Sequence, residues 1–118
     1  GTAINVIGTM VRLFTLWQTP LEEGETLEIA FDRVSVPELA VDDLFDDAFT
    51  AIARDGAGLV EVSIRLQKAF GALAEIGDEA VIAAAKKHSR LALSRSVRAM
   101  SQQDDIEATR QAAALLAR

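Results

Sequence analysis

His88, the only histidine of the 118-residue chain, is the first side chain to consider for chemistry. Arg95 follows seven residues later, so both project from one side of a predicted helix, along a stripe of alanines and leucine. This pair could bind an anion or a carboxylate in a cleft. Alternatively, backbone carbonyls or an acid from a neighbouring helix satisfy both side chains, as is usual for buried polar groups. The pattern leaves both interpretations open and favours the second.

Four aspartates in the stretch VDDLFDD form another candidate site. Asp42 and Asp46 are four residues apart, as are Asp43 and Asp47, so each pair stacks on one side of a helix. Carboxylate oxygens are ligands that Mg²⁺ and Ca²⁺ prefer, which makes a metal site conceivable. Acidic residues also favour the first turn of a helix, where they offset its dipole. Because no further ligand motif accompanies the aspartates, we favour the second explanation and expect no metal and no cofactor.

Motifs for covalent or nucleotide chemistry are missing from the sequence. The stretch ARDGAGL has the glycines of a phosphate-binding loop, but it lacks the G-K-[ST] ending and follows a predicted helix instead of a strand. The sequence contains no G-x-S-x-G, H-E-x-x-H or dinucleotide-binding fingerprint. We therefore expect a non-catalytic protein. The alternative is a ligand- or metal-binding helical domain, enzymatic or not, that uses Asp42, Asp46, His88 and Arg95.

Charge is unevenly distributed along the chain. The net charge is −6, and residues 22–47 contain ten acidic side chains and one arginine. This acidity argues against nucleic-acid binding, which depends on neutralising phosphates. A later basic row, formed by Lys87, Arg90, Ser94 and Arg98, could meet anionic lipid headgroups or the acidic segment of a second copy. A solvated helix face is the simpler explanation of such a row.

The first element predicted to position these residues is a helix over residues 3–18, ended by Pro20. Large apolar side chains occupy most of its circumference, and a helix of this kind must be covered by protein. The run is too short, with Asn5 and Arg12 inside it, to be a good membrane span. We expect a fragment of a larger protein, whose leading helix a second subunit covers. The predicted interface residues are Ile4, Ile7, Val11, Phe14, Trp17, Leu27 and Ile29.

A short β segment is predicted next, because apolar and polar residues alternate in TLEIAF, residues 26–31. The parity changes after Arg33, which indicates a turn or bulge, and Pro37 closes the segment. One or two strands are not stable alone in water. We expect a partner strand from a second copy or from sequence outside the chain.

From residue 38 onward, apolar residues recur with the spacing of an α-helix. Helices are predicted over residues 41–54, 58–76 and 79–101, and from Asp104 or Asp105 onward, with Gly56 and Gly77 as stops and Asp78 as an N-cap. Short loops imply antiparallel neighbours. The predicted fold is mainly α (α+β): one domain over 1–118, with a lead helix and β segment in 1–37 and an up-down four-helix bundle in 38–118. The predicted core includes Leu44, Phe45, Ala48, Phe49, Ile52, Leu59, Leu91 and Ala99.

Two stretches resemble a bacterial family of predicted integral-membrane proteins of unknown function. GTAINVIGTMVRLFTLW is similar to a segment that in this family follows a loop ending in Asn-Asp-Pro, and that loop is absent here. DDLFDDAFTAIARDGAGLVEVSIRLQKAFGALAEIGDEAV is similar to the helical stretch near the family's C-terminus. The resemblance implies a soluble part tethered to a membrane part, located at the cell membrane and facing the cytoplasm. It offers no catalytic residues to carry over.

Together these observations predict a non-catalytic assembly or regulatory domain of a membrane protein. The expected partner is a second copy of the chain, in a homo-oligomer. We expect no binding to nucleic acid.

Overall fold

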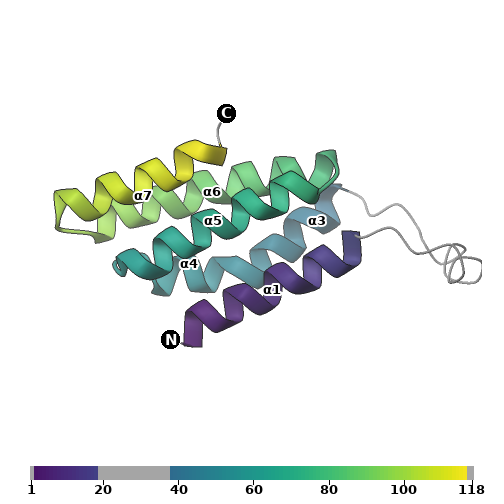
Figure 1. Ribbon diagram of the computed structural model, residues 1–118, viewed down its shortest axis with the longest axis horizontal. Coiled ribbons are helices and arrows are strands. Elements are labelled where there is room, and N and C mark those ends of the chain that lie inside the picture. Colours follow the sequence, from purple (N-terminus) through teal and green to yellow (C-terminus); the bar gives the residue numbers. More distant parts are fainter. Residues whose placement is uncertain (1, 19–37, 117–118) are drawn as a thin grey trace, which may run out of the picture.

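A computed structural model of the chain describes the backbone of residues 2–18 and 38–116, and the side chains of residues 2–12 and 40–116. This part of the chain is mainly helical (Figure 1). The short β segment predicted within 26–36 lies outside the described residues. The helices are α1 (Thr2–Gln18), α3 (Glu38–Phe45), the π-helical turn η2 (Asp46–Thr50), α4 (Ala51–Asp55), α5 (Val60–Ile76), α6 (Glu79–Ala99) and α7 (Gln103–Leu116).

The turns between the later helices follow the predicted stop and start signals. The backbone N–H of Gly56 bonds to the Ile52 carbonyl after α4, and that of Gly77 bonds to the Leu73 carbonyl after α5. Asp78 is the N-cap of α6, because its Oδ1 accepts a bond from the Val81 N–H at 3.1 Å.

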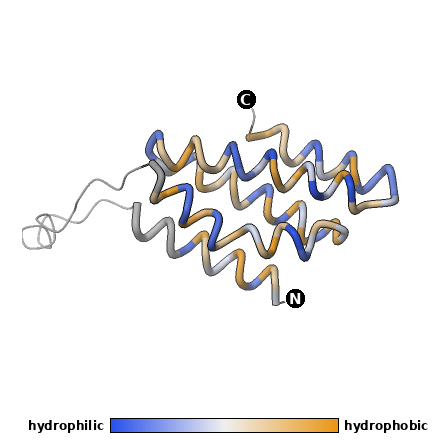
Figure 2. The backbone as a smooth tube through the Cα atoms, turned by 180° about the vertical axis from the view of Figure 1, so that it is seen from behind, coloured by the Kyte–Doolittle hydropathy of each residue, from blue (hydrophilic) through white to orange (hydrophobic). Residues whose placement is uncertain are grey.

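Successive helices from α3 onward run in opposite directions, with α3, η2 and α4 forming one continuous rod (Figure 1). Helix α5 contacts α6 and α7, which also contact each other, while α3, η2 and α4 contact α6. Helix α1 contacts α5 and lies at the edge opposite α7 (Figure 1). Hydrophilic and hydrophobic residues alternate along the helices, as one-sided burial requires (Figure 2).

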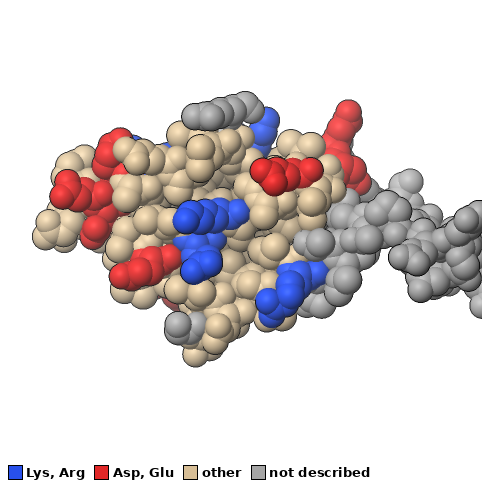
Figure 3. Space-filling model, viewed as in Figure 1, with Lys and Arg blue, Asp and Glu red and all other residues tan. Residues whose placement is uncertain are grey.

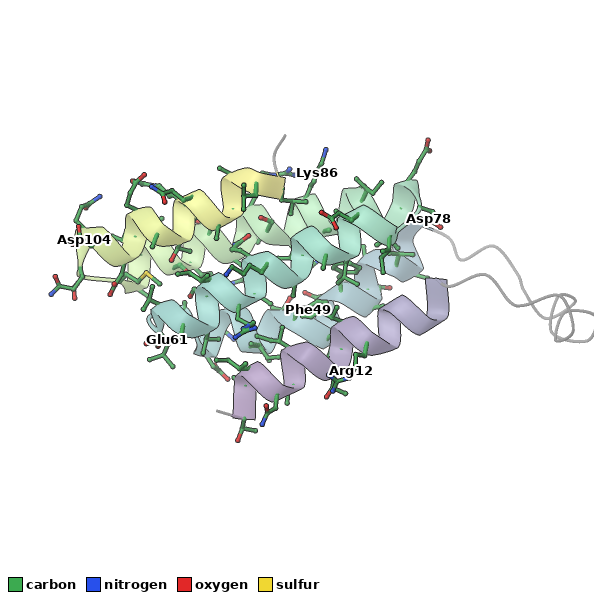
Figure 4. The ribbon with its side chains drawn as sticks, viewed as in Figure 1. Arg12, Phe49, Glu61, Asp78, Lys86 and Asp104 are labelled. Atoms are coloured by element: carbon green, nitrogen blue, oxygen red, sulfur yellow. The ribbon has the colours of Figure 1, made fainter. Side chains whose placement is uncertain are left out.

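Three phenylalanines form the centre of the core. Phe49 lies 5.2 Å from Phe70, edge to face, and Phe45 stacks on Phe70 at 6.3 Å between ring centroids. Phe49, labelled in Figure 4, belongs to η2 and contacts Phe70 of α5. Ile7 of α1, only 1% exposed, belongs to the same buried cluster. Helix α1 therefore takes part in the core of its own chain.

The outer side of α1 is polar as far as its side chains are described. Thr2, Asn5, Thr9 and Arg12 are exposed, and Arg12 donates to Thr9 Oγ1 at 3.2 Å (Figure 4). Over residues 2–12 the exposed side chains of α1 are therefore polar, while Ile4, Ile7 and Val11 face the core. A narrow polar stripe of this kind suits a helix at the edge of a bundle.

The π turn η2 keeps the rod in phase with the core. Val41, Phe45, Phe49 and Ala53 are all buried and follow one another at intervals of four. Four residues exceed one α-helical turn of about 3.6 residues, so a row with this spacing drifts around a regular helix. A π turn contains more residues per turn and reverses the drift.

Four residues predicted for the core are exposed instead, and Leu59, 56% exposed just before α5 begins, is the most exposed large side chain among them. Leu44 is 43% exposed because it projects to the side of α3 away from Asp42, and Leu91 is 42% exposed on the outer side of α6. Ala99 is exposed at the last residue of α6.

Candidate functional site

The contact between α3 and α6 brings together Asp42, Lys87 and His88. His88 Nε2 lies 2.9 Å from Asp42 Oδ1, and Lys87 Nζ donates to Asp42 Oδ2 at 2.8 Å. The His88 side chain is 5% exposed, that of Asp42 30% and that of Lys87 50%. The cluster thus runs from the interior to the surface, and both oxygens of the carboxylate have a partner.

The surroundings of the cluster favour the ionised form of Asp42. The hydrogen bonds from Lys87 and then His88 hold the pKa of the Asp42 carboxyl below its ordinary value of 3.8, although burial opposes this shift. On the inner side, the ring of Phe45 lies 5.7 Å from the His88 ring. Packing and charge therefore fix the imidazole in one position.

An aspartate bonded to a histidine can orient a general base, provided that a nucleophile or substrate reaches the other ring nitrogen. The buried serines of α5 and α6 are used elsewhere. Ser89 Oγ donates to Gln67 Oε1 at 2.5 Å, Ser96 Oγ donates to Ser63 Oγ at 2.9 Å, and Ser63 Oγ contacts the carbonyl oxygens of Gly56 and Ala57. The hydrogen bonds of these serines therefore join α5 to α6 and to the turn before α5.

The other predicted site residues are not part of this cluster. Asp46 Oδ1 accepts a bond from Thr50 Oγ1 at 2.6 Å, one turn along the same rod. Asp43 and Asp47 are exposed, and Arg95 is half-buried two turns beyond His88 on α6. Within residues 2–18 and 38–116, no group of three or more His, Cys, Asp or Glu side chains is arranged to hold a metal ion.

The predicted interface residues are only partly within the described side chains. Ile7 is buried in the chain's own core, and Ile4 and Val11 are half-buried against it. The side chains of Phe14 and Trp17, and residues Leu27 and Ile29 as a whole, lie outside the described part. The burial of Ile7 therefore requires no second copy.

Sequence reasoning missed Gln67, which is 1% exposed between α5 and α6. Its Nε2 donates to the Ser89 carbonyl at 3.0 Å, and its Oε1 accepts from the same serine. The available signal was its position four residues after Ser63 on the buried face of α5. Every fully buried side-chain nitrogen or oxygen in the described part of the chain has a hydrogen-bond partner.

The comparisons with known proteins give one match. The model of a family described as predicted membrane protein (DUF2254) matches residues 1–72, which include α1, α3, η2, α4 and most of α5. Neither the curated proteins nor the solved structures contain a match. No helix among the described residues combines the length and the hydrophobicity that crossing a bilayer requires.

Proposed function

Since the chain belongs to the DUF2254 family of predicted membrane proteins, we propose that it is a non-catalytic assembly or regulatory domain of a membrane protein. In this proposal residues 1–118 act as one domain, in which α1 and the helices from α3 onward share a core. The domain is tethered to a membrane part and faces the cytoplasm, as the resemblance of the sequence implied.

The observation that carries the proposal is that the side chains capable of chemistry are hydrogen-bonded to one another. Asp42 is bonded to Lys87 and His88, and Gln67 is bonded to Ser89. Groups that are already bonded to each other must lose those bonds before they bind a substrate, which costs free energy. A domain with this arrangement is suited to present a stable surface to another protein.

The proposed partner is a second copy of the chain, in a homo-oligomer. Sedimentation velocity of the 118-residue chain over a hundredfold range of concentration tests this. A reversible, concentration-dependent increase in mass supports the proposal, whereas a monomer at every concentration contradicts self-assembly.

A ligand- or metal-binding domain is the second candidate, because two of its four residues, Asp42 and His88, do meet. Its test is thermal unfolding with Mg²⁺, with Ca²⁺ or with inorganic phosphate. A ligand at a hundred times its Kd stabilises the folded state by about 2.7 kcal/mol, which raises the melting temperature by several degrees. This candidate requires such a shift to disappear in Asp42→Asn, and it fails if no probe shifts the transition.

A further inference from the structure

Helices α3 and α6 carry exposed rows of opposite charge next to each other. The acidic row consists of Asp43, Asp46 and Asp47, all exposed on α3 and η2. The basic row consists of Lys87, Arg90 and Arg98, all exposed on α6. Because α6 packs along α3 and η2, the two rows lie side by side, joined by the ion pair between Asp42 and Lys87.

Each row is continuous because of helical spacing. Lys87, Arg90, Ser94 and Arg98 recur at intervals of three or four residues, and all four are exposed. Leu91, 42% exposed, lies on the same side and adds an apolar contact. Glu79 is the only acidic residue of α6, which contains five lysines and arginines. The face with α5 and α7 in front carries scattered charges of both signs instead (Figure 3).

Lys87 and Arg90 lie at the height of the acidic row, whereas Arg98 lies about 16 Å beyond Lys87, at the height of α4. Helices α3 and α6 run in the same direction (Figure 1), and Asp42 contacts Lys87. Asp47 is five residues beyond Asp42, and Arg90 is three residues beyond Lys87. At about 1.5 Å per residue, their heights differ by less than one helical turn.

From this arrangement we propose that the α3–α6 face binds the same face of a second copy of this chain. A twofold axis parallel to the two helices places the acidic row of each copy opposite the basic row of the other, with heights preserved. Dimers of identical chains commonly use one patch on both subunits in this way. The inference rests on the proposed assembly function and specifies the partner and the surface.

Charge complementarity favours this occupant over an anionic membrane surface. Such a surface attracts lysine and arginine but repels the acidic row that lies directly beside them. A second copy satisfies both rows at once, and opposite charges across an interface select the register and the partner.

The test reverses one charge in each row of the full 118-residue chain and measures the dimer Kd by sedimentation equilibrium. Arg90→Glu and Asp47→Lys each place like charges opposite one another, so each is expected to weaken the dimer by about tenfold. The double variant restores opposite charges across the axis and is expected to recover most of the affinity. The wild-type dimer is also expected to weaken between 50 mM and 500 mM NaCl, because salt screens exposed charges.

Two variants with the same charge changes on other exposed surfaces are the controls, Lys68→Glu on α5 and Glu107→Lys on α7. They should leave the Kd unchanged, and circular dichroism verifies that every variant is folded. If neither single reversal changes the dimer Kd, the proposed face is wrong but self-assembly is still supported. If the chain is a monomer at all concentrations, both the face and self-assembly are wrong. In co-sedimentation with phosphatidylglycerol–phosphatidylcholine vesicles, binding weakened by Arg90→Glu and strengthened by Asp47→Lys would identify a lipid surface and overturn the dimer.

Discussion

Helix α6 is held by different chemistry on its two sides. Towards α3 it uses Lys87 and His88, both on the carboxylate of Asp42, and these side chains reach from the interior to the solvent. Towards α5 it uses neutral groups, with Ser89 bonded to Gln67, and these side chains are almost completely buried. One contact therefore depends on pH and salt, and the other does not.

The comparison indicates which contact should respond to mutation and which should respond to pH and salt. A partly exposed ion pair contributes little because water and salt screen it. A buried neutral pair contributes modestly while intact, but leaving one partner alone is costly because the buried group cannot return to water. The α5–α6 contact should therefore respond strongly to mutation, and the polar part of the α3–α6 contact should respond strongly to conditions.

The largest expected effect on the free energy of unfolding comes from removing an apolar side chain, not a charged one, from the α3–α6 contact. Phe45 is fully buried against Phe70 and His88, so Phe45→Ala should lower the free energy of unfolding by about 3–5 kcal/mol. Urea unfolding followed by circular dichroism measures this change. Leu44→Ala, at the exposed neighbouring position, is the control and should cost less than about 1 kcal/mol. Equal losses of stability in both variants would contradict the finding that Phe45 faces the core and Leu44 faces the solvent.

An intermediate effect is expected at the α5–α6 contact. Gln67→Met keeps much of the volume but leaves the Ser89 hydroxyl without its acceptor, at a cost of about 1–3 kcal/mol in the free energy of unfolding. Adding Ser89→Ala removes the unpaired hydroxyl, so the double variant should lose less than the sum of the two single variants. Strict additivity would show that the two side chains do not depend on each other.

The smallest effect should reveal the pH dependence of the α3–α6 contact. The folded-state pKa of Asp42 is lowered, so its pairing stabilises the fold fully above its ordinary pKa and less as the pH falls through the lowered value. Asp42→Asn should therefore cost about 1 kcal/mol at pH 7, and the loss should begin to shrink as the pH falls below the ordinary pKa of 3.8. Urea titrations from pH 3 to 7 measure the difference. Gln67→Met should show no such trend over the same range.

Local features of the fold were largely predictable from the sequence. The predicted helices over 58–76 and 79–101 correspond to α5 and α6 to within two residues at each end, because periodicity and the Gly77–Asp78 signal are encoded locally. The π turn was not predicted, since the sequence of the rod reads as a regular helix. The place of α1 was not predicted either, because Asn5 and Arg12 were weighed only against a membrane span and were not grouped with Thr9 as one polar side of the helix.

The residues of the candidate site could be predicted from the sequence, but their arrangement in space could not. Asp42 and His88 were both selected from the sequence, and so was the possibility that an acid from a neighbouring helix satisfies the histidine. Their pairing joins residues 46 positions apart and requires α3 to lie beside α6, which no local pattern specifies. Gln67 was missed because a single glutamine on a helix is normally exposed.

The π turn η2 holds one residue more than a regular α-helix would need to span the same part of the rod. Deleting one residue between positions 46 and 50 would allow an ordinary α-helix through the whole rod. Tightening of the π turn to an α turn would restore almost the same rotation as the deleted residue had carried, about 100°, so the segments before and after it would keep their relative orientation. The extra residue therefore lies in a turn of the rod whose length can change by one without turning Asp42 away from α6.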